Sequence, residues 1–175
     1  MRELLFVPGS LRAASASRAT VRALHERLEN RARITVADVG KLPLYNADIT
    51  DNQDVATFIA QVAGADGVVF VTPEYNYSVP GLLKNAIDWA SRPAYASVFR
   101  GKPCFVISVS GGALGGVRAQ AHLKYVLNGM LAEVHTCKEI IIPLANQKVK
   151  DGVLEDETIL AFAEENLVQF LQRLA

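Results

Sequence analysis

The chain has 175 residues, half of them hydrophobic and 21% charged, a composition that excludes an intrinsically disordered protein. Its 18 Lys and Arg balance its 18 Asp and Glu, so the basic excess typical of a nucleic-acid-binding protein is missing. The length predicts a single domain over residues 1–175 with a sizeable hydrophobic core.

Short apolar runs alternate with longer amphipathic segments along the whole sequence. In chain order, the pattern predicts a strand over 3–7, a helix over 17–32, a strand over 33–39, a helix over 52–63, a strand over 67–71, a helix over 80–91, a strand over 103–109, a helix over 116–130, a strand over 133–137 and a helix over 155–174. Residues 140–154 are the least regular stretch, so we expect a long surface connection there.

This alternation of strands and helices indicates a parallel sheet with helices on both faces. Because crossovers between parallel strands are right-handed, few topologies remain. We expect an α/β doubly wound fold, with a five-stranded parallel sheet in the order 2-1-3-4-5 inside three α/β/α layers. Ligands bind such folds beyond the carboxyl ends of the strands, which directs attention to the loops after the first, third and fourth strands.

The cytoplasm is the expected compartment. Cys104 and Cys137 are too few for a disulfide scaffold, and neither has the CxxC or Cys/His spacing of a zinc site. The short apolar run before Pro8 does not match a secretory signal, and no apolar run approaches the roughly 20 residues of a membrane span. We therefore expect no metal site, and neither a membrane nor a nucleic acid as partner.

The loop after the first strand is rich in hydrogen-bond donors. Residues 8–18 read PGSLRAASASR, with hydroxyls from Ser10, Ser15 and Ser17 and guanidinium groups from Arg12 and Arg18. A phosphate monoester needs backbone amides, hydroxyls and cations at a helix start. The Walker A and GxGxxG patterns are absent, and one serine alone would be explained by ordinary helix capping. We interpret the whole set as an anion site.

The other two loops have features of a site for a flat ring. Residues 72–81 read TPEYNYSVPG, a stiff aromatic loop that suits the rim of a planar heterocycle and is equally explained by tyrosines packing on a helix. Residues 108–116 read SVSGGALGG, in which paired glycines let the backbone approach a ligand, although alone they would indicate a flexible turn. Phosphate and flat-ring sites together indicate a mononucleotide, and flavin mononucleotide (FMN) is the usual occupant of this topology.

Three segments resemble the NADPH-dependent FMN reductase family of flavodoxin-like flavoproteins, which includes quinone, chromate and azo-dye reductases. They are residues 9–15 (GSLRAAS), 73–89 (PEYNYSVPGLLKNAIDW) and 115–123 (GGVRAQAHL). The resemblance extends over residues 4–130. It implies a flavodoxin-like fold, FMN as cofactor and NADPH or NADH as electron donor.

The resemblance also implies roles for particular residues. Ser10, Arg12, Ser15 and Ser17 would hold the FMN phosphate, Pro73, Glu74, Tyr75 and Asn76 would line the ribityl chain and the isoalloxazine ring, and Ser110, Gly111 and Gly112 would meet the ring. Many relatives have asparagine where Ser17 stands. Tyr77 is a candidate for the nicotinamide site or simply packs against its neighbours. No catalytic side chain is implied, because the cofactor carries the chemistry.

The implied reaction is a ping-pong transfer from NAD(P)H through FMN to a small-molecule acceptor, such as a quinone, chromate, an azo compound or free flavin. Family members are dimers or tetramers, which implies a homodimer or a homotetramer here. One alternative is a flavodoxin-like electron-transfer protein without NAD(P)H activity, a class that is usually acidic and lacks the equivalent of Arg12. Another is a response-regulator-like module, which needs clustered aspartates where this chain has Ser10 and Arg12.

Two residues within the family-like segments have simple structural interpretations. Lys84 and Asp88 lie four residues apart on a predicted helix, which favours an ion pair on its surface. His122 lies in the third family-like segment, where we expect it to pack or to form a hydrogen bond rather than to act on a ligand.

Overall fold

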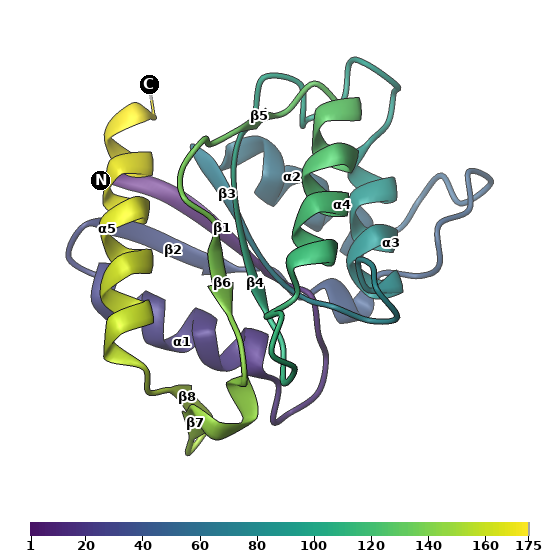
Figure 1. Cartoon of the computed structure of the whole chain (residues 1–175). Helices are drawn as coiled ribbons and strands as arrows, with labels where there is room; N and C mark the ends of the chain where they lie inside the picture. Colours follow the sequence, from purple (N-terminus) through teal and green to yellow (C-terminus); the bar gives the residue numbers. More distant parts are fainter. Residues whose placement is uncertain (175) are drawn as a thin grey trace.

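A parallel sheet lies at the centre of the computed structural model, which describes residues 1–174 (Figure 1). The order of its main strands is β2-β1-β3-β4-β5. These strands are β1 (Arg2–Pro8), β2 (Ala32–Val36), β3 (Gly67–Pro73), β4 (Pro103–Val109) and β5 (Glu133–Val134). Every recorded pairing among them is parallel. The predicted flavodoxin-like strand order is therefore confirmed.

Helices cover both faces of this sheet. The hydrophobic cluster on one face involves α1 (Ala16–Leu28) and α5 (Glu157–Arg173), and the cluster on the other involves α2 (Gln53–Gly64), α3 (Gly81–Ala90) and α4 (Val117–Gly129). Successive residues of a strand point to opposite faces, so β1 contributes to both clusters and is apolar from Leu4 onwards, after the charged Arg2 and Glu3. Among residues 1–174, no helix has both the length and the apolar character needed to cross a bilayer.

Polar side chains define where three of the helices begin. Ser15 caps α1 by accepting a hydrogen bond from the Arg18 N–H at 3.3 Å. Asn52 caps α2, and Asp156 caps α5 in the same way. A hydrogen bond from Lys148 and another from the Ile159 N–H lower the pKa of Asp156. By contrast, the residue at the N-cap of α4 is a glycine, so this helix must obtain its cap from elsewhere in the chain.

The structure of residues 140–154 differs from the prediction. Instead of a surface connection, Ile140–Ile142 form β6, which pairs in parallel with the second half of β4. The predicted strand over 133–137 is reduced to β5, which pairs only with the start of β4. Beyond β6, a helical turn η2 (Ala145–Gln147) precedes an antiparallel hairpin of β7 (Val149–Lys150) and β8 (Val153–Leu154).

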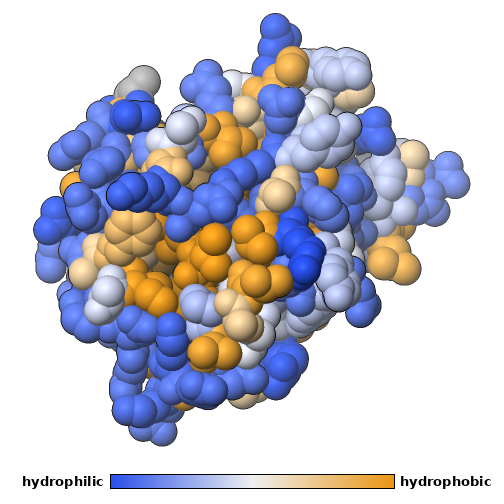
Figure 2. Space-filling view, viewed as in Figure 1, coloured by the Kyte–Doolittle hydropathy of each residue, from blue (hydrophilic) through white to orange (hydrophobic). Residues whose placement is uncertain are grey.

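The physical reason for this difference is that two short strands, β5 and β6, pair with different parts of the same edge of β4. Ile140 and Ile142 are completely buried, so three consecutive isoleucines complete the edge that β5 leaves open. Figure 2 shows apolar surface between α4 and α5, on the side of the molecule where β6 lies. At the other edge, β2 ends at Val36, three residues earlier than predicted, and Val39–Lys41 form the short helix η1.

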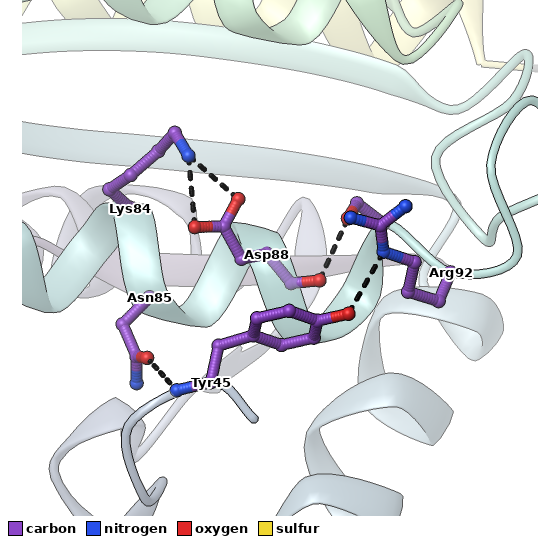
Figure 3. Close-up of polar contacts among 6 residues, drawn as sticks. Tyr45, Lys84, Asn85, Asp88 and Arg92 are labelled. Carbon is purple, nitrogen blue, oxygen red and sulfur yellow. Dashed lines mark hydrogen bonds and ion pairs between the residues drawn. The ribbon is translucent and has the colours of Figure 1, made fainter. Parts of the chain in front are cut away.

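The outer surface of α3 fixes the loop that precedes α2 (Figure 3). The Tyr45 N–H donates to Asn85 Oδ1 at 2.7 Å, and Arg92 Nε donates to the Tyr45 hydroxyl oxygen at 3.1 Å. Lys84 Nζ lies 2.7 Å from Asp88 Oδ1, which confirms the ion pair predicted from their spacing. Because this pair is partly exposed, we expect it to contribute little to stability.

A partly buried histidine lies beside the start of β4, at the amino-terminal end of the sheet. The carboxyl ends of the strands, where ligands bind in such folds, are at the opposite edge. The His135 ring stacks on Phe105 with centroids 5.5 Å apart and meets Phe170 edge-on at 5.3 Å. Its Nε2 is buried without a hydrogen-bond partner among residues 1–174. Burial lowers the pKa of His135 below its ordinary value of 6.5, and the positive charge of Arg173 lowers it further.

This lowered pKa predicts a dependence of stability on pH. Because the unfolded chain binds the proton more readily than the folded one, the free energy of unfolding should fall as the pH drops below about 6.5. His135→Phe keeps the aromatic stack and removes the proton site. We expect urea denaturation at several pH values to show that the free energy of unfolding of the variant rises relative to that of the wild type as the pH falls. A stability difference that stays constant with pH would contradict this role of His135.

Candidate functional site

A cleft at the carboxyl ends of β1, β3 and β4 brings the three predicted loops together. Its lining consists of Ser10, Arg12, Ala14, Ser15, Ala16, Ser17, Pro73, Glu74, Tyr75, Val109, Ser110, Gly111 and Asn146. Nine of the twelve site residues proposed from the sequence are in this lining. The other three, Asn76, Tyr77 and Gly112, lie in the same loops but outside it. The cleft is where a doubly wound fold binds its ligand.

The first wall of the cleft is the loop that leads from β1 into α1. Ser10, Ser15 and Ser17 are buried, with Ser15 Oγ lying 2.8 Å from Ser17 Oγ. Arg12 is exposed, and its guanidinium takes part in none of the ion pairs found within residues 1–174. Hydroxyls, the amino-terminal end of a helix and a cation without a carboxylate partner together form a site for an anion.

The second wall is the loop after β3, which Glu74 fastens to α4. Glu74 Oε2 accepts hydrogen bonds from the backbone N–H groups of Arg118 at 3.0 Å and Ala119 at 3.2 Å. Its Oε1 accepts from Arg118 Nη1 at 3.3 Å. The carboxylate therefore supplies the cap that α4 lacks, and its negative charge lies at the positive end of the helix dipole.

The same loop makes a tight turn just outside the cleft. Tyr75 and Ser78 exchange two backbone hydrogen bonds of 3.0 Å, and between them Asn76 and Tyr77 have φ angles of +48° and +67°. Ser78 Oγ lies 3.0 Å from Nδ1 of His122, so His122 has a hydrogen-bonding role, as expected. These contacts hold the turn in a conformation that residues other than glycine rarely adopt.

Aromatic side chains of this turn connect α4 to the first wall. The Arg118 guanidinium lies over the Tyr77 ring, 4.4 Å from its centroid, which is a cation–π geometry. The Tyr75 hydroxyl donates to Ser10 Oγ at 3.2 Å. Tyr75 and Tyr77 are nevertheless 46% and 67% exposed, so both rings present apolar surface at the mouth of the cleft.

The third wall consists of the glycine loop after β4 and the segment that follows β6. Backbone hydrogen bonds join the two: the Ser110 N–H donates to Ile142 O at 3.0 Å, the Ala145 N–H to Ser110 O at 2.9 Å and the Leu144 N–H to Gly112 O at 3.1 Å. Segment 142–146 therefore holds the glycine loop in place.

Asn146 belongs to the lining but was not predicted from the sequence. It lies in η2, within residues 140–154, the stretch that was expected to be a surface connection. The Ile140–Ile142 run is the sequence feature that could have indicated this position of Asn146. A strand that pairs in parallel with β4 ends at the same edge of the sheet as β4, which is the edge where the cleft lies.

The residues that form these walls can be compared with known proteins. A family model described as NADPH-dependent FMN reductase matches residues 2–147, a range that includes every residue lining the cleft. The chain belongs to the NADPH-dependent FMN reductase family. The resemblance noted in the sequence is therefore confirmed at the level of the family.

Individual proteins are also similar to this chain over most of its length. A 2-hydroxy-1,4-benzoquinone reductase from Burkholderia sp is 46% identical over 126 residues, which cover 71% of this chain and 69% of that protein. An NAD(P)H-dependent FMN reductase from Pseudomonas aeruginosa is 38% identical over 178 residues, covering 98% and 92%. The solved structure of a flavoenzyme NAD(P)H:(acceptor) oxidoreductase from Paracoccus denitrificans has a TM-score of 0.87 at 31% identity and covers 99% of each chain.

Proposed function

We propose that this chain is an FMN-dependent NAD(P)H oxidoreductase that reduces quinones. The observation that carries the proposal is the cleft itself, where an anion site at the start of α1 lies beside a rigid aromatic loop. When bound there, FMN would supply the redox chemistry, with NAD(P)H as hydride donor and the quinone as electron acceptor. The family match and the relatives named as FMN and quinone reductases support this assignment.

The donor set of the first wall fits the phosphate of FMN. We assign Ser10, Ser15 and Ser17 as hydroxyl donors and Arg12 as the neutralising cation, with backbone N–H groups at the start of α1. Glu74 is the one acidic residue among those that line the cleft, and its carboxylate already accepts hydrogen bonds from the start of α4. The cleft therefore favours an anion electrostatically.

The other two walls would hold the ring and stabilise charge on it. Pro73, Glu74 and Tyr75 present backbone from one side, and Ser110 and Gly111 from the other. Pro73 has no N–H, and those of Tyr75 and Ser110 donate to Ser78 O and Ile142 O. The N–H groups of Glu74 and Gly111 would therefore stabilise the negative charge that reduction places on the ring, as fixed dipoles do at other reaction centres. We assign no acid, base or nucleophile to the protein.

Residues outside the lining would act at the mouth of the cleft. Asn76 and Gly112 support the ring site, and Tyr77, stacked on Arg118, borders the space where a nicotinamide or a quinone approaches. Chromate, azo compounds and free flavin are further acceptors that need the same open access. Steady-state oxidation of NADPH and of NADH with each acceptor measures which are used.

We also propose a homodimer or homotetramer, each subunit a single domain of residues 1–175, in the cytoplasm. Tyr75, Tyr77 and Leu114 are 46%, 67% and 54% exposed around the cleft, and burial against a second copy would remove this apolar surface from water. Sedimentation of the purified protein at micromolar concentration tests the assembly. A protein that stays monomeric there would contradict it.

The second candidate function is an electron carrier without NAD(P)H activity. The zero net charge disfavours it, because carriers of this fold are usually acidic, and so does Arg12, which forms no ion pair within residues 1–174. Bound flavin that is bleached by dithionite but by neither NADPH nor NADH would favour the carrier. Bleaching by either nucleotide would favour the enzyme.

Arg12→Ala tests the phosphate site directly. Loss of one charge-assisted contact should weaken FMN binding by about 1.5–3 kcal/mol, without affecting folding because Arg12 is exposed and forms no ion pair within residues 1–174. Arg33→Ala is the matched control, since this exposed arginine pairs with Glu3 at the opposite end of the sheet. Fluorescence titration of the flavin-free proteins gives both affinities. Equal affinities for the two variants would show that Arg12 is not a phosphate ligand.

A further inference from the structure

We infer that Asn146 is a further cofactor-binding residue, whose carboxamide donates a hydrogen bond to the phosphate end of the bound mononucleotide. This inference rests on the function proposed above. No pattern in the sequence marks Asn146, which reaches the cleft only because β6 ends beside β4.

The position of Asn146 makes its side chain part of the wall. A methyl group built on Gly111 would lie 2.7 Å from Asn146 Nδ2, so the carboxamide lies directly against the glycine loop. Asn146 is exposed towards the cleft, and among residues 1–174 its carboxamide makes no hydrogen bond. Its donors are therefore free for a ligand.

The fold holds Asn146 in a fixed relation to the start of α1. Ala16 and Ser17, the first residues of that helix, line the same cleft as Asn146. The hairpin that follows Asn146 is tied to α1 by a hydrogen bond of 2.6 Å from Arg22 Nε to Gly152 O. A ligand anion at the amino-terminal end of α1 therefore lies in the space that Asn146 borders.

The chemistry of the cleft explains why an amide, rather than an acid, suits this position. A phosphate accepts hydrogen bonds and repels free carboxylates, and the one acidic side chain of the lining is turned towards α4. An aspartate at position 146 would have nearly the same shape but would place an unpaired negative charge beside the phosphate. The Asn146→Asp exchange therefore isolates the electrostatic part of the contact.

The test compares FMN with riboflavin, which has the same ring and ribityl chain but no phosphate. Flavin-free wild type, Asn146→Asp, Asn146→Ala and Gln147→Glu are titrated with each flavin, and binding is followed by flavin fluorescence. Gln147→Glu is the matched control, because it adds the same charge at an exposed neighbour outside the lining. Riboflavin binding also reports that each variant retains a folded cleft.

We expect Asn146→Asp to weaken FMN binding at least about tenfold and riboflavin binding less than about twofold. Asn146→Ala should weaken FMN binding about threefold to tenfold, and Gln147→Glu should leave it within about twofold. An Asn146→Asp variant that binds FMN as tightly as Gln147→Glu, or that loses riboflavin as strongly as FMN, would overturn the inference. A wild type that binds neither flavin would overturn the proposed function as well, so the two failures are distinguishable.

Discussion

Replacing Gly115 with alanine is expected to destabilise the folded chain by about 2–5 kcal/mol and to displace the third wall of the cleft. Gly115 has a φ of +58°, a conformation that side chains disfavour. A methyl group there would lie 2.3 Å from Ile141 Cγ2 and 3.0 Å from the backbone nitrogen of Pro143. Because Ile141 belongs to β6, which is paired with β4, the backbone has little freedom to move away.

Chemical denaturation measures this loss of stability. Gly129→Ala is the control, because it lies at the end of α4 and a methyl group there meets no other atom within 4 Å. That exchange should leave stability unchanged or raise it by up to about 1 kcal/mol. A Gly115→Ala protein as stable as the wild type would show that the close approach between the glycine loop and β6 is not required.

The second large effect is expected for Glu74→Ala, at about 2–4 kcal/mol of stability. The loss combines a helix cap with hydrogen bonds to a charged partner, since both backbone N–H groups at the start of α4 and the Arg118 guanidinium lose their acceptor. Release of the turn that Glu74 holds should also weaken flavin binding. The side chain of Glu74 is only 13% exposed, so solvent replaces these hydrogen bonds poorly.

Two further variants separate the possible causes. Glu74→Gln keeps an acceptor for the helix and removes the charge, so it should lose less stability than Glu74→Ala. Asp88→Ala breaks a partly exposed ion pair on α3 and should cost no more than about 0.5 kcal/mol. If thermal denaturation shows Glu74→Ala to be no more harmful than Asp88→Ala, the carboxylate does not fasten the loop.

Local patterns were sufficient to predict the centre of the fold. Gly67–Pro73 and Pro103–Val109 are apolar almost throughout, because strands covered on both faces have no side exposed to water. The loops after these strands carry residue types that neither helices nor strands require. Since parallel strands end at one edge of the sheet, those loops had to meet, and the cleft shows that they do.

Long-range pairing explains what the sequence did not reveal. The three residues Ile140–Ile142 are too few to show a periodicity, and their role depends on the open place that β5 leaves beside β4. Asn146 was missed for the same reason. Glu74 was expected beside the ring, but no local pattern shows that its carboxylate caps a helix that begins more than 40 residues later.

The most direct test of the proposed function is an anaerobic titration of the purified, FMN-saturated protein with NADPH, followed by its visible absorption. We expect the protein to retain FMN after gel filtration, to lose the absorption of oxidised flavin as NADPH is added and to regain it when benzoquinone is supplied. A colourless protein that retains no FMN after saturation would contradict the central claim that the cleft is an FMN site.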